Sequence, residues 1–221
     1  MHYKPANKDH NLPFDPFKAC VGPRPIGWIS TVSKDGVCNL APFSQFNNLS
    51  YDPPLIMLAL TQQGVEASEI RRKDTTKNIE DTGFFAYNIV PYSLKDAMNQ
   101  TAAPVPPEVD EFELAGLTKE DCIDIPCKMV AESPIKMECK LVQTIRIPGN
   151  TPKTTVDILI GEVIHVHIAD EFITPEGKVD IVKIRPLGRL GYFDYTTVDS
   201  VFSMRMPVSN PKQLAAMEGR S

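Results

Sequence analysis

The sequence predicts a mainly β fold, in which many strands close into a barrel and a few helices lie at its periphery. Two observations support this prediction. Segments rich in apolar and β-branched residues recur along the 221 residues, whereas clear helix signals are few. The 20 prolines lie mostly between the candidate strands, where they do not interrupt a hydrogen-bonded ladder. A chain of this length can bury a sizeable core as a single β-rich domain.

The first predicted element is a β-hairpin near the N-terminus. Residues 26–32 (IGWISTV) and 37–41 (VCNLA) have strand character, and Asp35-Gly36 between them supplies the turn chemistry. Residues 55–60 (LIMLAL) form a short continuous apolar run, which suits a strand that is buried on both faces. Residues 84–90 (FFAYNIV) are the next strand candidate.

Two long segments predict a second hairpin further along the chain. Residues 135–147 (IKMECKLVQTIRI) and 154–173 (TTVDILIGEVIHVHIADEFI) are β-rich, and the turn-forming segment PGNTPK separates them. Residues 178–184 (KVDIVKI) are predicted to form one more strand.

Helix signals occur at three places. Residues 74–83 give the best one, because Asp74 is a suitable N-cap and Gly83 a suitable C-terminal stop. Two weaker candidates follow, at residues 93–102 with Ser93 as the cap and at residues 108–116. The Pro- and acid-rich residues 103–134 are expected to pass over the barrel as a lid or a dimer contact.

Composition and charge exclude several classes of protein. The net charge of −5 argues against a general nucleic-acid or membrane binder. No apolar run approaches the roughly 20 residues of a membrane span, and the N-terminal segment has no apolar core for a signal peptide. We therefore expect a cytoplasmic protein. The five cysteines are odd in number and scattered, which does not indicate a disulfide framework.

Neither a metal site nor a catalytic set of side chains stands out. His165 and His167 alternate along a predicted strand and so point to one face, but two imidazoles alone do not define a metal site. Cys122 and Cys127 have no matching second pair, and Cys38 has no evident partner histidine. The G-x-S-x-G, P-loop and G-x-G-x-x-G motifs do not occur. We predict no metal and no catalytic side chain, with the chemistry left to a bound cofactor.

Residues 23–54 mix polar and aromatic side chains in a way that suits a flat ligand with polar edges. Arg24 and Pro25 precede the first strand. The hydroxyl and amide groups come from Ser30, Thr31, Asn39, Ser44, Asn47 and Asn48, and the flat apolar surface from Trp28, Phe43 and Phe46. The alternative is a loop at the strand ends whose polar side chains satisfy their own backbone.

A second stretch suits a terminal phosphate. Arg71, Arg72 and Lys73 directly precede the first predicted helix, whose N-terminus presents backbone N–H groups and a partial positive charge. Asp74 would compete with the phosphate unless it turns its charge into the helix cap. The alternative is a solvated basic turn before an ordinary helix.

A third stretch, residues 185–197 (RPLGRLGYFDYTT), is expected to form a Gly-flanked loop after the last strand. Arg189 there could pair with an anion or with an acidic neighbour.

In this order the segments resemble the flavin reductase-like family of FMN-binding split barrels. The matching segments are PRPIGWISTVSKDGVCNLAPFSQFNNLSYDPP, KDTTKNI, GFFAYNIV, DEFELAGLT, ESPIKMEC, IGEVIHVHI and RPLGRLGYFDY. The resemblance covers about residues 14–196. It implies one domain over residues 1–221, a six-stranded Greek-key split β-barrel with a C-terminal extension at 197–221. Such proteins are usually homodimers with FMN at or near the subunit interface.

The resemblance also implies which residues bind FMN. The flavin is expected to contact Arg24, Pro25, Ile26, Ser30, Thr31, Asn39, Ala41, Pro42, Ser44, Phe46 and Asn47. The segment expected near the phosphate contains Lys73, Asp74, Thr75 and Asn78. Arg189 and Tyr192 match a late loop that reaches toward the flavin, across the dimer.

The activity implied by the resemblance is that of an FMN-dependent oxidoreductase of the flavin reductase type. Hydride would pass from NADH or NADPH to flavin and on to free flavin, oxygen or a partner protein such as a monooxygenase. One alternative is an FMN-binding electron carrier, similar to flavoredoxin, without NAD(P)H activity of its own. Another is a flavinless barrel that serves as an interaction or small-ligand module. Nothing in the sequence marks a nicotinamide site.

Overall fold

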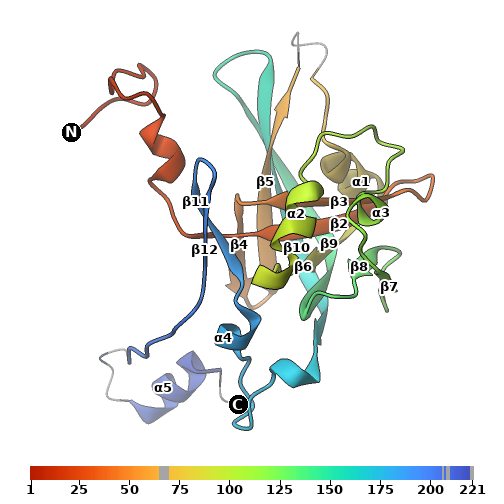
Figure 1. Ribbon diagram of the computed structural model, residues 1–221, viewed down its shortest axis with the longest axis vertical. Coiled ribbons are helices and arrows are strands. Elements are labelled where there is room, and N and C mark those ends of the chain that lie inside the picture. Colours follow the sequence, from red (N-terminus) through yellow and green to blue (C-terminus); the bar gives the residue numbers. More distant parts are fainter. Residues whose placement is uncertain (65–69, 206, 208–209, 220–221) are drawn as a thin grey trace.

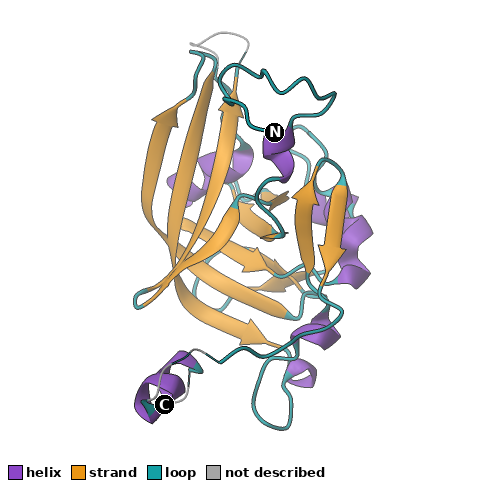
Figure 2. Cartoon of the chain, turned by 90° about the vertical axis from the view of Figure 1, so that its left-hand side faces the viewer, coloured by secondary structure: helices purple, strands orange, loops and turns teal. Residues whose placement is uncertain are grey.

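A curved antiparallel sheet organises the computed structural model, which describes residues 1–64, 70–205, 207 and 210–219 (Figures 1 and 2). The strand order is β3-β2-β6-β9-β10-β5-β4. The strands are β2 (Gly27–Val32), β3 (Cys38–Phe43), β4 (Phe46–Tyr51), β5 (Pro54–Gln63), β6 (Phe84–Asn88), β9 (Ile135–Pro148) and β10 (Thr154–Ile168). The prediction of a mainly β protein is confirmed, but the expected count of six strands and the expected closure of the barrel are wrong, because this sheet has seven strands and does not close.

The curvature follows from a short connection between the two edges of the sheet. β3 and β4 lie at opposite ends of the strand order, yet only Ser44 and Gln45 separate them in sequence. The carbonyl of Gln45 accepts a hydrogen bond from the Ala59 N–H of β5 at 2.8 Å. The sheet therefore has to curl until its edges approach each other, and within the described residues β3 and β4 do not pair.

Two small sheets accompany the main one, and they contain strands that the sequence did not predict. β1 (Arg24–Pro25), β11 (Leu187–Gly191) and β12 (Asp194–Thr197) form one, and β7 (Lys119–Asp121) and β8 (Lys128–Val130) form the other. The late stretch predicted as a loop is thus the β11–β12 hairpin. The polar stretch expected after β3 as a loop contains β4. These strands are short and lack apolar alternation, so they gave no periodic signal.

The three predicted helices are present, with different N-terminal boundaries. The helices are α1 (Asp74–Thr82), α2 (Lys95–Gln100), α3 (Glu111–Leu114), α4 (Ile181–Ile184) and α5 (Pro211–Met217), with 3₁₀ helices η1 (Pro16–Ala19), η3 (Tyr92–Leu94) and η4 (Asp170–Phe172). The stop at Gly83 is confirmed, since Gly83 is the C-cap of α1 with a φ of 81°. The N-cap of α1 is Lys73 rather than Asp74, and the Gln62 side chain accepts a hydrogen bond from the Lys73 N–H at 2.7 Å. Ser93 lies in η3, and α2 has Leu94 as its N-cap.

Residues 178–184, predicted as a strand, instead contain the short helix α4. The Asp180 side chain accepts from the backbone N–H of Lys183 at 2.9 Å and caps this helix. An aspartate in a competent N-cap position stabilises a helical turn, and it outweighed the β-branched composition here.

The core lies inside the curled sheet and beneath α2 and α3. Ile29, Leu58, Phe85 and Leu159 belong to the cluster within the sheet, and a second cluster around Trp28 packs against the helices. β5 was predicted to be buried on both faces, but its burial alternates along the strand. One face joins the core, and the other is half-buried.

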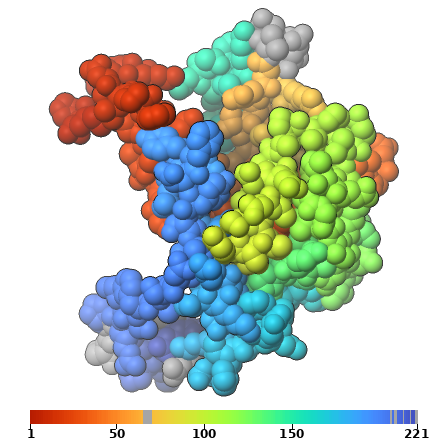
Figure 3. Space-filling model, viewed as in Figure 1, coloured from red at the N-terminus to blue at the C-terminus, as the bar shows by residue number. Residues whose placement is uncertain are grey.

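The two ends of the chain extend from this body. Residues near the N-terminus and α5 near the C-terminus project away from the curved sheet in Figures 1 and 3. Among the described residues, no helix combines the length and apolar character needed to cross a bilayer.

Candidate functional site

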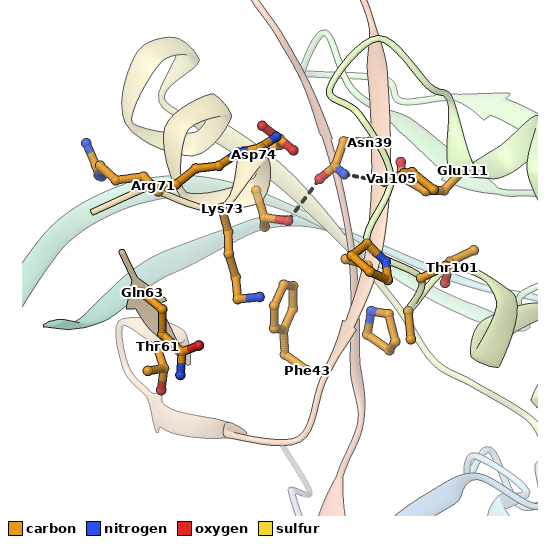
Figure 4. A pocket seen from close by; sticks show the side chains of 17 residues that line it. Asn39, Phe43, Thr61, Gln63, Arg71, Lys73, Asp74, Thr101, Val105 and Glu111 are labelled. Atoms are coloured by element: carbon orange, nitrogen blue, oxygen red, sulfur yellow. Dashed lines mark hydrogen bonds between the residues drawn. The ribbon is translucent and has the colours of Figure 1, made fainter. Parts of the chain in front are cut away.

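A cavity of about 520 Å³ lies where β3, the end of β5 and the start of α1 meet (Figure 4). The segment after α2 forms its remaining wall. The lining residues are Asn39, Ala41, Pro42, Phe43, Thr61, Gln63, Arg71, Arg72, Lys73, Asp74, Thr75, Thr101, Ala102, Ala103, Pro104, Val105 and Glu111. This volume is in the range of sites that hold cofactors. The cavity brings together six residues predicted to bind the cofactor: Asn39, Ala41, Pro42, Lys73, Asp74 and Thr75.

The start of α1 makes one end of the cavity electropositive. The first turn of a helix presents N–H groups and a partial positive charge. The Lys73 side chain extends into the cavity toward Phe43, whereas the Asp74 carboxylate lies on the opposite side of the chain (Figure 4). Asp74 nevertheless lines the cavity, so its charge is turned away from the Lys73 side chain but stays at this end of the site. This end of the cavity has the features of an anion site.

Arg72 also lines the cavity, but its guanidinium group is engaged in ion pairs with carboxylates of the protein. It pairs with Glu80 and lies 3.7 Å from the Asp157 carboxylate, which is fully buried. Arg146 completes this ion-pair cluster, with its Nε 2.7 Å from Asp157 and an Nη 2.9 Å from Glu80. The cluster fastens α1 to β9 and β10. Within the described part of the chain, the buried Nε of Arg72 has no hydrogen-bond partner.

A buried hydrogen-bond network positions the Asn39 side chain. The Thr31 and Thr75 hydroxyls donate to Asn39 Oδ1 at 3.2 and 2.9 Å. Asn39 Nδ2 in turn donates to Glu111 Oε1 at 2.9 Å. Asn78 supports this arrangement from below, because its Nδ2 donates to the Thr31 hydroxyl at 3.1 Å. The orientation of the Asn39 amide is thereby fixed at both ends.

Glu111 is the member of this network that the sequence did not reveal. It opens α3, lines the cavity and is 5% exposed. Burial raises the pKa of its carboxyl group, although hydrogen bonds from Leu40 N–H and Asn39 oppose the shift. Each carboxyl oxygen accepts one of these bonds. The only sequence signal was its place in an acidic predicted short helix at residues 108–116, and such helices are common on protein surfaces.

The opposite wall of the cavity comes from residues 101–105, where the predicted helix at 93–102 meets the segment expected to cover the barrel, residues 103–134. Thr101 anchors this wall, because its hydroxyl accepts a hydrogen bond from Trp28 Nε1 at 2.9 Å and donates to the Met98 carbonyl at 2.8 Å. In Figure 3 this yellow-green surface adjoins the orange surface of β5. Of the segment at 103–134, only residues 103–105 and Glu111 line the cavity, and the remainder includes α3 and the strands β7 and β8.

Several predicted residues lie behind the cavity rather than in it. Ser30 and Thr31 are fully buried and Asn78 is 5% exposed, and none of them lines the cavity. Thr31 and Asn78 act on the cavity through the Asn39 network. The Ser30 hydroxyl donates to the Lys128 carbonyl, and Ile26 belongs to the core cluster around Trp28.

The remaining predicted residues lie elsewhere on the molecule. Pro25, Phe46 and Asn47 line a separate apolar hollow of about 350 Å³, and half-buried Ser44 lies between β3 and β4. Arg24 lies opposite Arg189 in the ladder of β1 and β11. Its guanidinium group donates to the Val21 carbonyl. Arg189 lines a third hollow of about 430 Å³. The Tyr192 ring contacts Phe14. These residues do not join the main cavity within one chain.

Comparison with known proteins shows the family and the fold to which this chain is similar. The family model described as "Flavin reductase like domain" matches residues 22–188. Nitrilotriacetate monooxygenase component B from Bacillus cereus is 32% identical and superposes with a TM-score of 0.81, covering 92% of this chain and 98% of that chain. The 2-nitrobenzoate 2-nitroreductase NbaA of Pseudomonas fluorescens is 26% identical, with a TM-score of 0.78 and coverage of 96% and 98%. A protein from Shewanella frigidimarina, assigned as a flavin reductase with a split barrel domain, is 26% identical, with a TM-score of 0.75 and coverage of 95% and 100%.

Proposed function

The chain belongs to the flavin reductase-like family, which binds flavin on a split barrel, and on this premise we propose that it is an FMN-dependent oxidoreductase of the flavin reductase type. NADH or NADPH would be the electron donor, and free flavin, oxygen or a partner protein the acceptor. One observation carries the proposal: the cavity joins an anion-binding helix start to a wall of fixed amide and apolar groups.

The electropositive end of the cavity suits the FMN phosphate. Lys73 supplies a mobile cation, and the start of α1 supplies backbone N–H groups. The buried Nε–H of Arg72 also lacks a hydrogen-bond acceptor among the residues that the structure describes. A phosphate here would place its charge beside the Lys73 ammonium group and the N-terminus of α1, whereas the charge of Arg72 is already balanced by Glu80 and Asp157.

The β3 wall suits the ring system. Ala41, Pro42 and Phe43 offer apolar surface, and Asn39 offers an amide whose orientation the buried network fixes. Bound FMN supplies the two-electron chemistry, because its ring accepts a hydride without an acid–base residue of the protein. The roles left to this chain are to bind, to orient and to exclude water, which agrees with the absence of a catalytic side-chain motif in its sequence.

The electron acceptor that we favour is a partner monooxygenase. The support is similarity along nearly the whole chain to a protein described as a monooxygenase component. We also propose that the protein is a homodimer and that the partner subunit brings further residues, such as Arg189 or Tyr192, toward the flavin. That arrangement would account for predicted site residues that lie outside the cavity of one chain.

An absorption spectrum of the purified protein tests the proposal, recorded with added FMN before and after anaerobic NADH and NADPH. We expect flavin bands that bleach with one or both donors. Bands that persist would contradict the reductase activity and favour the electron carrier. A colourless protein that does not bind added FMN would contradict both and favour a flavinless binding module.

A further inference from the structure

A cluster of metal-ligand side chains lies at the end of β10 that is remote from the cavity. His165 and His167 point to one face of the strand, as predicted, and their rings stack with centroids 4.6 Å apart. The structure adds a carboxylate that sequence spacing could not place: Glu138 on β9. One ligand atom from each of these three residues lies within 4.8 Å of the others.

A β-bulge brings the two histidines onto the face that carries Glu138. Val163 pairs with Cys139, but the next pair is His165 with Glu138, so Ile164 is an extra residue in β10. Without this insertion the alternation would send His165 to the same side as Val163, toward the core. Bulges of this kind often re-aim side chains at functional sites.

The surroundings of Glu138 resemble the outer shell of a metal site. Its carboxylate is fully buried and accepts backbone N–H groups of Ile123, Asp124 and Ile125 at 2.7, 2.8 and 3.1 Å. These bonds orient the carboxylate. The direction they leave open points toward His167 Nε2, which lies 2.8 Å from Glu138 Oε1. Carboxylates that ligate metals are commonly held by hydrogen bonds in this way.

The two histidines are also presented as ligands. Asp124 Oδ2 lies 2.9 Å from His165 Nδ1, which fixes that ring and leaves its Nε2 available. At metal centres a carboxylate commonly orients a ligating imidazole in this way. The side chain of His165 is 34% exposed and that of His167 is 17% exposed. The cluster is therefore open to solvent on one side, where an ion can enter and a water ligand can complete its coordination.

We propose that Glu138, His165 and His167 bind a divalent transition-metal ion of the Zn²⁺ class. Two imidazoles, one carboxylate and a water are a donor set that Zn²⁺ accepts in tetrahedral geometry. Metal–ligand bonds of about 2.0–2.1 Å place the ligand atoms about 3.3 Å apart. The contact between His167 and Glu138 must then open by a few tenths of an ångström to admit the ion, while the three ligands draw together.

The bound ion would fasten the turn at residues 122–127 to the main sheet. Glu138 already holds three N–H groups of this turn, and Asp124 of the same turn contacts His165. The cluster is independent of the proposed flavin site. None of its three residues lines the cavity, and His165 lies nine positions along β10 from Val156, whose partner Thr61 lines it.

A titration of the chelator-treated protein with Zn²⁺, followed by calorimetry and by metal analysis after dialysis, tests the proposal. We expect about one ion per chain for the wild type and a loss of affinity of at least about tenfold for His165→Ala and for His167→Ala. His2→Ala is the matched control and should bind as the wild type does. Zn²⁺ should also raise the melting temperature of the wild type more than that of either site variant.

Two other outcomes would overturn the proposal. One is the absence of stoichiometric binding to a folded wild-type protein. The other is binding that survives in the His165→Ala/His167→Ala double variant but is lost in Cys122→Ser, which would assign the ion to thiols. FMN affinity, measured in parallel, should be the same in His165→Ala and the wild type. The FMN affinity therefore shows, independently of metal binding, whether the variant is folded and its flavin site intact.

Discussion

Asn39 illustrates how individual residues create the proposed flavin site. Its amide is held by two hydroxyl groups on one side and by Glu111 on the other. An amide fixed in this way presents a defined hydrogen-bonding edge, whereas a free asparagine would pay conformational entropy to do so. The residues that hold Asn39 therefore matter for binding even where they do not reach the cavity.

Lys73 gives the first prediction at the scale of a residue. Replacement by alanine removes a charge-assisted hydrogen bond to the proposed phosphate, worth about 1.5–3 kcal/mol, so FMN affinity should fall about 10- to 100-fold. Riboflavin lacks the phosphate, and its affinity should change much less. Isothermal titration with both ligands measures the difference. Lys77→Ala, one turn later on α1 and exposed, is the control; equal losses for FMN and riboflavin would contradict the anchor.

Glu111 gives the second prediction. Glutamine can accept at only one of the two positions that receive N–H groups, so Glu111→Gln should lower the free energy of unfolding by about 1–3 kcal/mol near neutral pH. Loosening of Asn39 should weaken FMN binding as well. Denaturant unfolding and FMN titration measure the two effects. An unchanged stability together with unchanged FMN affinity would show that the network has no such role.

The same carboxyl group has a defined pH dependence. Because burial raises the pKa of Glu111 above 4.5, the folded state retains a proton that the unfolded chain releases at lower pH. Its contribution to stability is present below pH 4.5 and is lost as the pH rises through the raised pKa. The stability of the wild type relative to Glu111→Gln should therefore decline over that interval, as seen in unfolding curves at a series of pH values. A relative stability that rises there would reverse the assigned shift.

At the scale of elements, the long hairpin of β9 and β10 connects the cavity, the core and the histidine cluster. Its Thr154 end pairs with the part of β5 that lines the cavity, its middle contributes to the core, and its far end holds the histidine cluster. Gly161 lies in the middle of β10, where a Cβ atom would come within 2.3 Å of the Phe85 ring. The glycine thus allows the buried ring to cross the strand.

Gly161→Ala adds only one methyl group but should nevertheless destabilise the protein strongly. Overpacking of this kind costs about 1–3 kcal/mol, and we expect a loss of that size in the free energy of unfolding. The double variant Gly161→Ala/Phe85→Leu is the test of mechanism, since a smaller side chain at position 85 relieves the clash. Its loss should be less than the sum of the two single losses. Additive losses would contradict a direct contact as the cause.

At the scale of the whole molecule, the outer face of the sheet carries a group of neighbouring apolar side chains. Cross-strand pairing aligns Ile145 of β9, Ile158 of β10 and Ala59 of β5, with Ile160 and Met57 in the adjacent row. All are half-buried or exposed in the single chain. A second copy packed on this face would bury it. It would also explain why residues 55–60 are continuously apolar although only one face of β5 joins the core.

This arrangement predicts a dimer that depends on the outer apolar face. Analytical ultracentrifugation should give twice the mass of the 221-residue chain. Ile145→Glu, at a side chain that is 40% exposed in one chain, should shift the protein toward the monomer without unfolding it, because only the interface would bury the new charge. Leu114→Glu on α3, at a similarly exposed apolar side chain, is the control. A monomeric wild type, or a dimer unaffected by Ile145→Glu, would contradict this interface.

The sequence by itself determined the elements that carry a repeating signal. The hairpin of β2 and β3, the long hairpin of β9 and β10, and the stop of α1 at Gly83 follow from alternation and turn chemistry, which act between neighbours in the chain. Local chemistry also indicated the basic helix start at Lys73. The short strands β4, β11 and β12 escaped prediction because their residues show no apolar alternation, although β4 pairs with the adjacent β5 and β11 with the adjacent β12.

Only the tertiary structure decided which of these groups meet. Asn39 and Glu111 are 72 residues apart, and only the packing of α3 on β3 makes them partners. Glu138 and the two histidines belong to different strands, and a bulge that no pattern announces brings them onto one face. Pairing register and bulges are set by the balance of burial over the whole sheet, so they cannot be read from a local window of sequence.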